Sequence, residues 1–79
     1  MKPSGVAADF AVLAILSVGG LMTVDQLSRE AGLTSWSTRA AVARLEARGL
    51  IVDSQRQGRW QITDRGRGAW TVKGKRFTL

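Results

Sequence analysis

Residues 23–49 read TVDQLSREAGLTSWSTRAAVARLEARG, and this stretch predicts two helices joined by a tight turn. Thr23 and Gln26 have the spacing of a capping box, in which each side chain accepts a hydrogen bond from the other residue's backbone amide. Gly32 supplies the left-handed residue that commonly follows the last turn of a helix. We therefore expect a short helix that begins after Thr23 and ends at Ala31.

A second helix is expected to start at Thr34, its N-cap, and to end at Arg48, before Gly49. Its apolar spacing at i, i+4 and i+7 predicts one buried face, formed by Thr38, Val42 and Leu45 with Ala41 beside it. The opposite face carries Ser35, Trp36, Arg39, Ala40 and Ala43, with Arg44 at its margin. Two helices joined by a few residues that include a glycine form a helix-turn-helix.

The flanking segments predict one further helix before this pair and a hairpin after it. Residues 9–17 place Val12, Leu13 and Leu16 on one helical stripe, and Gly19-Gly20 ends that helix. Residues 50–52 and 59–63 predict two strands around a polar turn at residues 55–58, with Trp60 and Ile62 pointing inward. A short last helix is expected from residues 63–64 to about 70. The basic segment 72–79 receives no assignment.

These elements predict a single domain over residues 1–79, with a core of about 9–71 and a basic tail at 72–79. The fold class is α+β and mostly α, with a three-helix core, a β-hairpin and a short C-terminal helix. A chain of 79 residues has little room for a shaped interior cavity, so we expect its function to lie on the surface.

The charge of the chain is unevenly distributed. Residues 1–34 contain two basic and three acidic residues, a net charge of −1, whereas residues 35–79 contain ten basic and three acidic residues, a net charge of +7. Excess arginine can serve solubility alone, but a basic field confined to one part of a chain favours a polyanionic partner, and nucleic acid is the commonest.

The composition excludes several other classes. The sequence has no Cys, His or Tyr and six scattered acids, so we propose no nucleophile–base pair, no metal site and no cofactor, and we expect no enzyme activity. The apolar stretch 6–22 is interrupted by Asp9 and several small polar residues, so it predicts neither a membrane span nor a leader peptide. We expect a cytoplasmic protein.

The order of helix, helix, turn, helix and hairpin is that of a winged helix-turn-helix. The chain resembles bacterial regulators of this fold, most closely the MarR type and related small repressors, over about residues 12–70. Three segments carry the resemblance: MTVDQLSREAGL at 22–33, RLEARGLI at 44–51 and ITDRG at 62–66. The resemblance implies a DNA-binding transcriptional regulator.

The resemblance places DNA contacts on the second helix of the pair and on the hairpin, called the wing. The candidate DNA-binding residues are Thr34, Ser35, Trp36, Ser37, Arg39, Ala40, Ala43, Arg44, Arg56, Gln57 and Arg59. Arg39 is the candidate to read guanine, because its forked guanidinium matches two acceptors on that base edge. Arginine at the wing suits a narrow minor groove, while hydroxyls and amides at a helix N-terminus suit a phosphate.

Some of these residues have structural interpretations as well. Ser37 can simply be the third residue of a capped helix, and Ala40 and Ala43 can serve helix propensity. Arg44 and Arg48 can pair with Glu46 or Asp53 on a solvated face, and we interpret Arg48 as structural. Trp36 either packs over the turn onto the preceding helix or lies exposed against DNA or a partner chain.

We expect a repressor that regulates its own gene, of the kind common on plasmids and phages, without a small-molecule effector. A homodimer on a pseudo-palindromic operator is expected, since one domain makes few base contacts. Its interface can be the first helix or the tail at 72–79. The alternatives are an architectural, recombination or replication accessory factor, a winged-helix module that binds another protein, and an RNA-binding protein.

Overall fold

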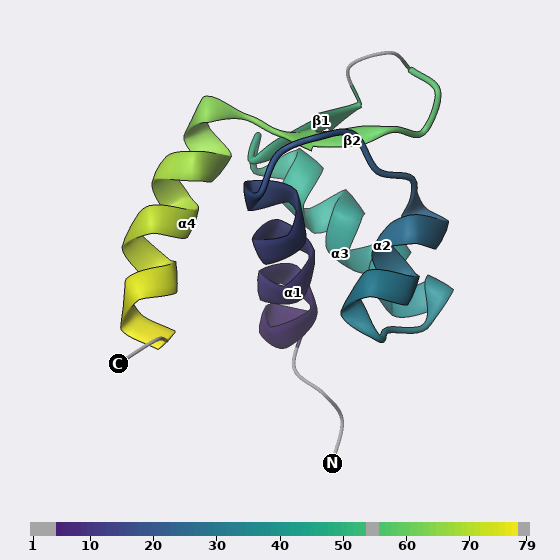
Figure 1. Cartoon of the computed structure of the whole chain (residues 1–79), viewed down its shortest axis with the longest axis horizontal. Coiled ribbons are helices and arrows are strands. Elements are labelled where there is room, and N and C mark those ends of the chain that lie inside the picture. The colour runs from purple at the N-terminus through teal and green to yellow at the C-terminus, as the bar shows by residue number, and fades with distance from the viewer. Residues whose placement is uncertain (1–4, 54–55, 78–79) are drawn as a thin grey trace.

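A computed structural model describes the chain at residues 5–53 and 56–77, with side chains at 7–53 and 56–71. The elements follow the order α1 (Gly5–Ser17), α2 (Val24–Ala31), α3 (Ser35–Ala47), β1 (Ile51–Asp53), β2 (Trp60–Ile62) and α4 (Asp64–Phe77). The strands cross one end of the helices, and α4 lies on the other side of α1 from α2 (Figure 1). This mostly helical arrangement confirms the predicted winged helix-turn-helix.

The starts of α2 and α3 form as the local sequence predicts. The Thr23 hydroxyl accepts from the Gln26 amide at 3.2 Å, and the Gln26 side chain accepts from the Thr23 amide at 2.9 Å. Gly32 then adopts a left-handed φ of 66° and ends α2. Thr34 caps α3 by accepting a hydrogen bond from the Ser37 amide at 3.0 Å. The turn between the two helices is therefore defined by caps on both sides.

The core forms where α1 packs against the other helices and the strands. Thr38 is fully buried in it, and its hydroxyl donates to the Thr34 carbonyl at 2.8 Å, so this polar group costs little to bury. The buried apolar residues are Ala8, Val12, Leu13, Leu16, Leu27, Ala41, Val42, Leu45, Leu50, Ile51 and Ile62. The predicted buried faces of α1 and α3 are both confirmed.

The hairpin has a third backbone partner that the sequence analysis did not predict. β1 and β2 pair antiparallel with Ile51 opposite Ile62. On the other side of β2, Met22 and Trp60 exchange two backbone hydrogen bonds, of 3.0 and 2.8 Å. Ile62 is buried and Trp60 packs against the core, which confirms their inward direction. The bridge ties the segment before α2 to the base of the wing.

The prediction of a last helix ending near residue 70 is wrong, since α4 continues to Phe77. The basic segment at 72–77 is thus part of a helix, while residues 78–79, like Gln55 of the predicted turn, lie outside the described residues. Three glycines in α4 lowered its apparent helix propensity, but packing along α1 compensates, with the rings of Phe10 and Trp70 centred 6.0 Å apart. The first helix likewise begins earlier than expected, at Gly5 rather than Asp9. None of the helices in the described ranges is long and apolar enough to cross a membrane.

The start of α4 lies very close to the beginning of β1. Thr63 accepts from the Gly66 amide at 3.0 Å, and its own hydroxyl lies 2.7 Å from the Gly49 carbonyl oxygen. A Cβ atom on Gly66 would overlap the Leu50 carbonyl oxygen and would lie 2.7 Å from the Ile62 side chain. Only a glycine fits at this position without movement of the backbone.

Candidate nucleic-acid interface

The exposed face of α3 carries the residues that the sequence assigned to base contacts. Trp36 is 83% exposed, and Arg39 and Ala43 are exposed as well, whereas Ala40 is half-buried. Because the residues around Arg39 on this face are mostly small, the helix backbone can approach a nucleic-acid groove closely. Of the two placements left open for Trp36, packing onto α2 is wrong, because the indole lies in solvent, while its contact with DNA or a partner chain stays a prediction.

The N-terminus of α3 presents hydroxyl groups at the start of the same face. Thr34 and Ser35 are exposed, and Ser37 is half-buried. The Ser37 amide already donates to the Thr34 hydroxyl, so Ser37 does occupy the third position of a capped helix. The amides at such a terminus and the helix dipole favour an anion. Phosphate contact by these residues stays a prediction.

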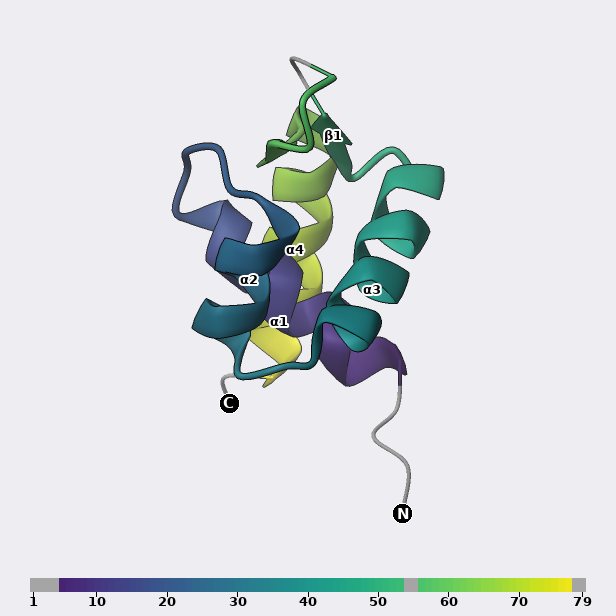
Figure 2. The same ribbon diagram turned by 90° about the vertical axis from the view of Figure 1, so that its right-hand side faces the viewer.

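The wing lies on the same side of the molecule as the N-terminal part of α3, away from α4 (Figure 1). Turned by 90°, the molecule shows the wing projecting beyond the C-terminal end of α3 (Figure 2). Arg56, Gln57 and Arg59 are all exposed there. The fold thus brings the start of α3 and the wing to one side of the molecule. Asp53, considered from the sequence only as an ion-pair partner of Arg44 or Arg48, accepts hydrogen bonds from two backbone amides of the wing turn.

Arg44 makes a structural contact that the sequence analysis did not foresee. Its Nη2 lies 2.9 Å from Oδ1 of Asp9, and its Nε donates to both oxygens of that carboxylate, at 3.0 and 3.2 Å. The partner lies on α1, 35 residues away, and is neither Glu46 nor Asp53. The hydrogen bond with Asp9 raises the pKa of the Arg44 guanidinium, a group that is charged throughout the physiological pH range. Arg44 therefore ties α3 to α1, and its contact with DNA stays a prediction.

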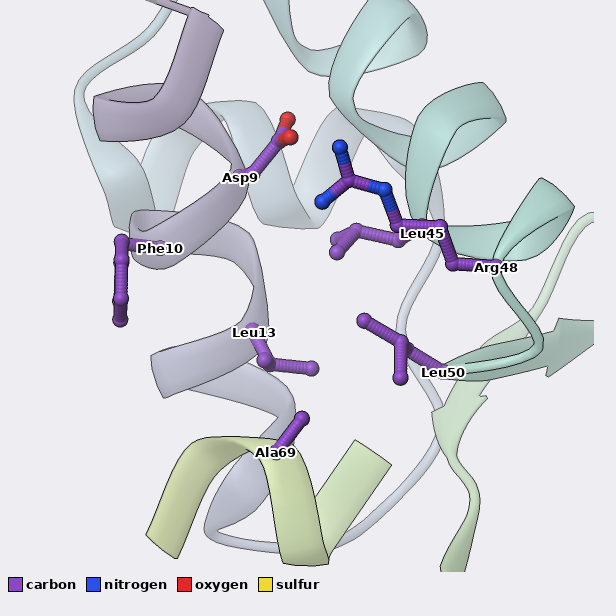
Figure 3. A pocket seen from close by; sticks show the side chains of 7 residues that line it. All are labelled: Asp9, Phe10, Leu13, Leu45, Arg48, Leu50 and Ala69. Atoms are coloured by element: carbon purple, nitrogen blue, oxygen red, sulfur yellow. The ribbon is translucent and has the colours of Figure 1, made fainter. Parts of the chain in front are cut away.

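A cavity of about 220 Å³ lies between α1, α3 and α4, apart from the face just described. Figure 3 shows Asp9 and Arg48 with their charged ends toward one side of this cavity. Apolar side chains line much of the rest; the lining residues are Asp9, Phe10, Leu13, Leu45, Arg48, Leu50 and Ala69. Arg48, interpreted from the sequence as structural, is exposed. Among the described residues, no cluster of acidic, His or Cys side chains could hold a metal ion.

Solved structures share the backbone arrangement of this chain. The crystal structure of ligand-free NadR superposes with a TM-score of 0.76 at 21% sequence identity, covering 90% of this chain and 53% of that one. The structure of a MarR-family transcriptional regulator from Silicibacter pomeroyi gives a TM-score of 0.74 at 30% identity, covering 84% of this chain and 47% of that one. The chain thus spans about half the length of these proteins. No curated protein matches it.

The sequence model of the MarR family matches residues 6–59, which is more than half of the chain. The matched range runs from α1 to the end of the wing turn and so contains the whole helix-turn-helix. Helix order, caps and wing agree with that assignment in the structure. The chain therefore belongs to the MarR family.

Proposed function

We propose that this chain binds double-stranded DNA in a sequence-specific manner and represses transcription, including that of its own gene. α3 enters the major groove and the wing contacts the flanking DNA. The observation that carries the proposal is the exposed face of α3, where Arg39 projects among mostly small residues. Both similarity to a MarR-family transcriptional regulator and membership of that family support it.

The electrostatics support the same partner. The chain carries a formal net charge of +6, and its excess of basic residues begins with α3. Arg39, Arg56 and Arg59 are exposed and lie in the two elements assigned to DNA. Such a field accelerates encounter with a polyanion and releases counterions on binding.

The small, polar and charged contact residues have distinct roles in this proposal. Arg39 reads a guanine, while Ala40 and Ala43 allow close approach and can pack on thymine methyls. Thr34, Ser35 and Ser37 bind a phosphate at the α3 N-terminus. Arg56, Gln57 and Arg59 contact the backbone or minor groove beside the site, and Arg44 contributes a phosphate contact from its position beside Asp9.

The functional unit in this proposal is a homodimer on a pseudo-palindromic operator. A dimer presents two copies of α3, which roughly doubles the number of base contacts. The segment 72–77, now part of α4, lies at the end of that helix away from the strands and on the other side of α1 from α2, so pairing through it leaves the wing and α3 accessible (Figure 1). We propose that the switch is the concentration of the protein itself and that no effector is required.

Selection of genomic fragments, followed by a mobility-shift assay at several salt concentrations, tests this proposal. We expect enrichment of a two-fold symmetric sequence and a log–log salt dependence with a slope of several units. Binding without sequence preference would replace repression with an architectural role. Absence of binding to any duplex would refute the DNA-binding proposal and leave the protein-binding and RNA-binding alternatives.

Replacement of Trp36 by alanine is expected to weaken DNA binding by roughly tenfold, as truncation of an interface tryptophan commonly costs more than 1 kcal/mol. The melting temperature should not change, because the side chain is 83% exposed in the free protein. Fluorescence anisotropy with a labelled duplex measures the affinity, and circular dichroism measures the melting.

Val18→Ala is the matched control for this prediction. Val18 is 88% exposed but follows the end of α1, where Arg67 of α4 donates to the Ser17 carbonyl at 3.3 Å. Its truncation should leave DNA affinity unchanged. Equal loss of affinity in both variants, or none in Trp36→Ala, would remove Trp36 from the interface.

A further inference from the structure

The turn of the wing is closed by a single carboxylate. Asp53, the last residue of β1, accepts from the Gln57 amide at 3.1 Å through Oδ1 and from the Gly58 amide at 2.8 Å through Oδ2. Its backbone carbonyl also accepts from the Arg56 amide, at 3.3 Å. Three successive amides of the turn thus converge on one residue at the end of the strand.

The backbone at Arg56 requires this support. Its φ of 52° is in the left-handed region, which arginine rarely adopts without other interactions that impose it. Gly58, with a φ of 74°, is also left-handed. The amides of residues 56–58 point toward Asp53, so the side chains of this segment are directed outward.

Within residues 5–53 and 56–77, no hydrogen bond or ion pair fixes the side chains of Arg56, Gln57 or Arg59. Arg56, Gln57 and Arg59 are exposed, so the direction in which they project follows from the backbone of the turn. A long flexible cation loses rotational freedom when it binds DNA, and a disordered turn would add its own ordering cost. A turn fixed beforehand avoids that second cost.

We propose that Asp53 is the positioning residue of the wing: its carboxylate closes the turn and presents Arg56 and Arg59 to DNA in a fixed geometry. This inference rests on the proposed DNA-binding function. In this inference the negative charge of Asp53 favours DNA binding, although it lies in a wing that is proposed to contact phosphates. By charge alone Asp53 opposes DNA binding, so the sign of its effect separates the two interpretations.

The first test compares Asp53→Ala with Asp64→Ala. Each substitution removes one acidic charge, and Asp64 is exposed in the first turn of α4. If Asp53 positions the wing, Asp53→Ala weakens DNA binding by about tenfold and lowers the magnitude of the salt slope by about one unit, whereas Asp64→Ala leaves affinity unchanged or slightly tighter. Tighter binding in both variants would overturn the inference.

Asp53→Glu separates charge from geometry. Glutamate keeps the charge, but its extra methylene displaces the carboxylate from the two amides. The inference predicts that Asp53→Glu binds DNA nearly as weakly as Asp53→Ala. Wild-type affinity in Asp53→Glu would show that the charge matters and the turn contacts do not.

A measurement without DNA tests the turn itself. In amide-resolved NMR spectra of the free protein, the Gln57 and Gly58 amide protons should shift and exchange faster with solvent in Asp53→Ala, while the amides of α3 stay in place. Unchanged Gln57 and Gly58 signals would overturn the inference even if the wild type binds DNA. Perturbed signals in a protein that binds no duplex would instead refute the proposed function alone.

Discussion

Gly66→Ala is expected to lower the free energy of unfolding by about 3 kcal/mol, the upper end of the cost of overpacking. The new methyl group would meet the Leu50 carbonyl oxygen and the Ile62 side chain, the latter at 2.7 Å. The carbonyl belongs to the backbone and accepts from the Thr63 amide at 3.0 Å, so it cannot move without loss of that hydrogen bond. A single domain of this size is stable by only about 3–5 kcal/mol, so the substitution should leave about 0–2 kcal/mol of stability, with up to about half of the protein unfolded.

Gly68→Ala provides a matched control within the same helix. A Cβ atom there meets nothing within 4 Å, so alanine should stabilise the protein by about 0.5–1 kcal/mol through helix propensity and reduced freedom of the unfolded chain. Urea denaturation followed by circular dichroism measures both variants. Similar midpoints for the two would mean that Gly66 does not lie against Leu50 and Ile62 as described.

Arg39→Ala is expected to abolish sequence preference, which is the largest functional effect in this account. One bidentate arginine–guanine contact discriminates by about 1–3 kcal/mol, and a dimer loses two such contacts. The ratio of operator to random-DNA affinity should therefore fall by roughly two orders of magnitude or more. Competition binding with the selected operator and a scrambled duplex measures this ratio.

Two control variants give this prediction its specificity. Arg39→Lys keeps the positive charge but lacks the forked guanidinium. The ratio of operator to random-DNA affinity should therefore fall, while the affinity for random DNA is retained. Arg56→Ala should weaken all duplexes alike and leave the ratio near that of the wild type, because wing contacts with phosphates carry no base information. An unchanged ratio in Arg39→Ala would show that the reading face has been assigned to the wrong residue.

The parts of the fold that the sequence predicted are those set by neighbouring residues. The capping box at Thr23, the cap at Thr34 and the left-handed Gly32 each depend on residues three or four positions apart. The buried face of α3 follows from helical periodicity in the same way. The exposed position of Arg39 was predicted with the buried face, because a helix that buries one side exposes the opposite side to solvent.

The features that the sequence did not predict depend on contacts between distant segments. The pairing of Asp9 with Arg44 joins residues 35 positions apart, and the Met22–Trp60 bridge joins the segment before α2 to β2. The length of α4 depends on its packing against α1, because the glycines of α4 by themselves favour an earlier end of the helix. Asp53 could have been found: an aspartate shortly before a glycine in a hairpin turn commonly binds the turn amides.

An amide-resolved NMR titration of the labelled protein with a DNA duplex at low salt tests the central claim most directly. Non-specific binding is strong enough under these conditions for the experiment to proceed without the operator. We predict that shifts concentrate at residues 34–44 of the α3 segment and at 56–59 of the wing, while the amides around the cavity at Leu13, Leu50 and Ala69 remain unchanged. Shifts confined to the side formed by α1 and α4, or no shifts at all, would contradict the assignment of α3 and the wing as the DNA-binding surface.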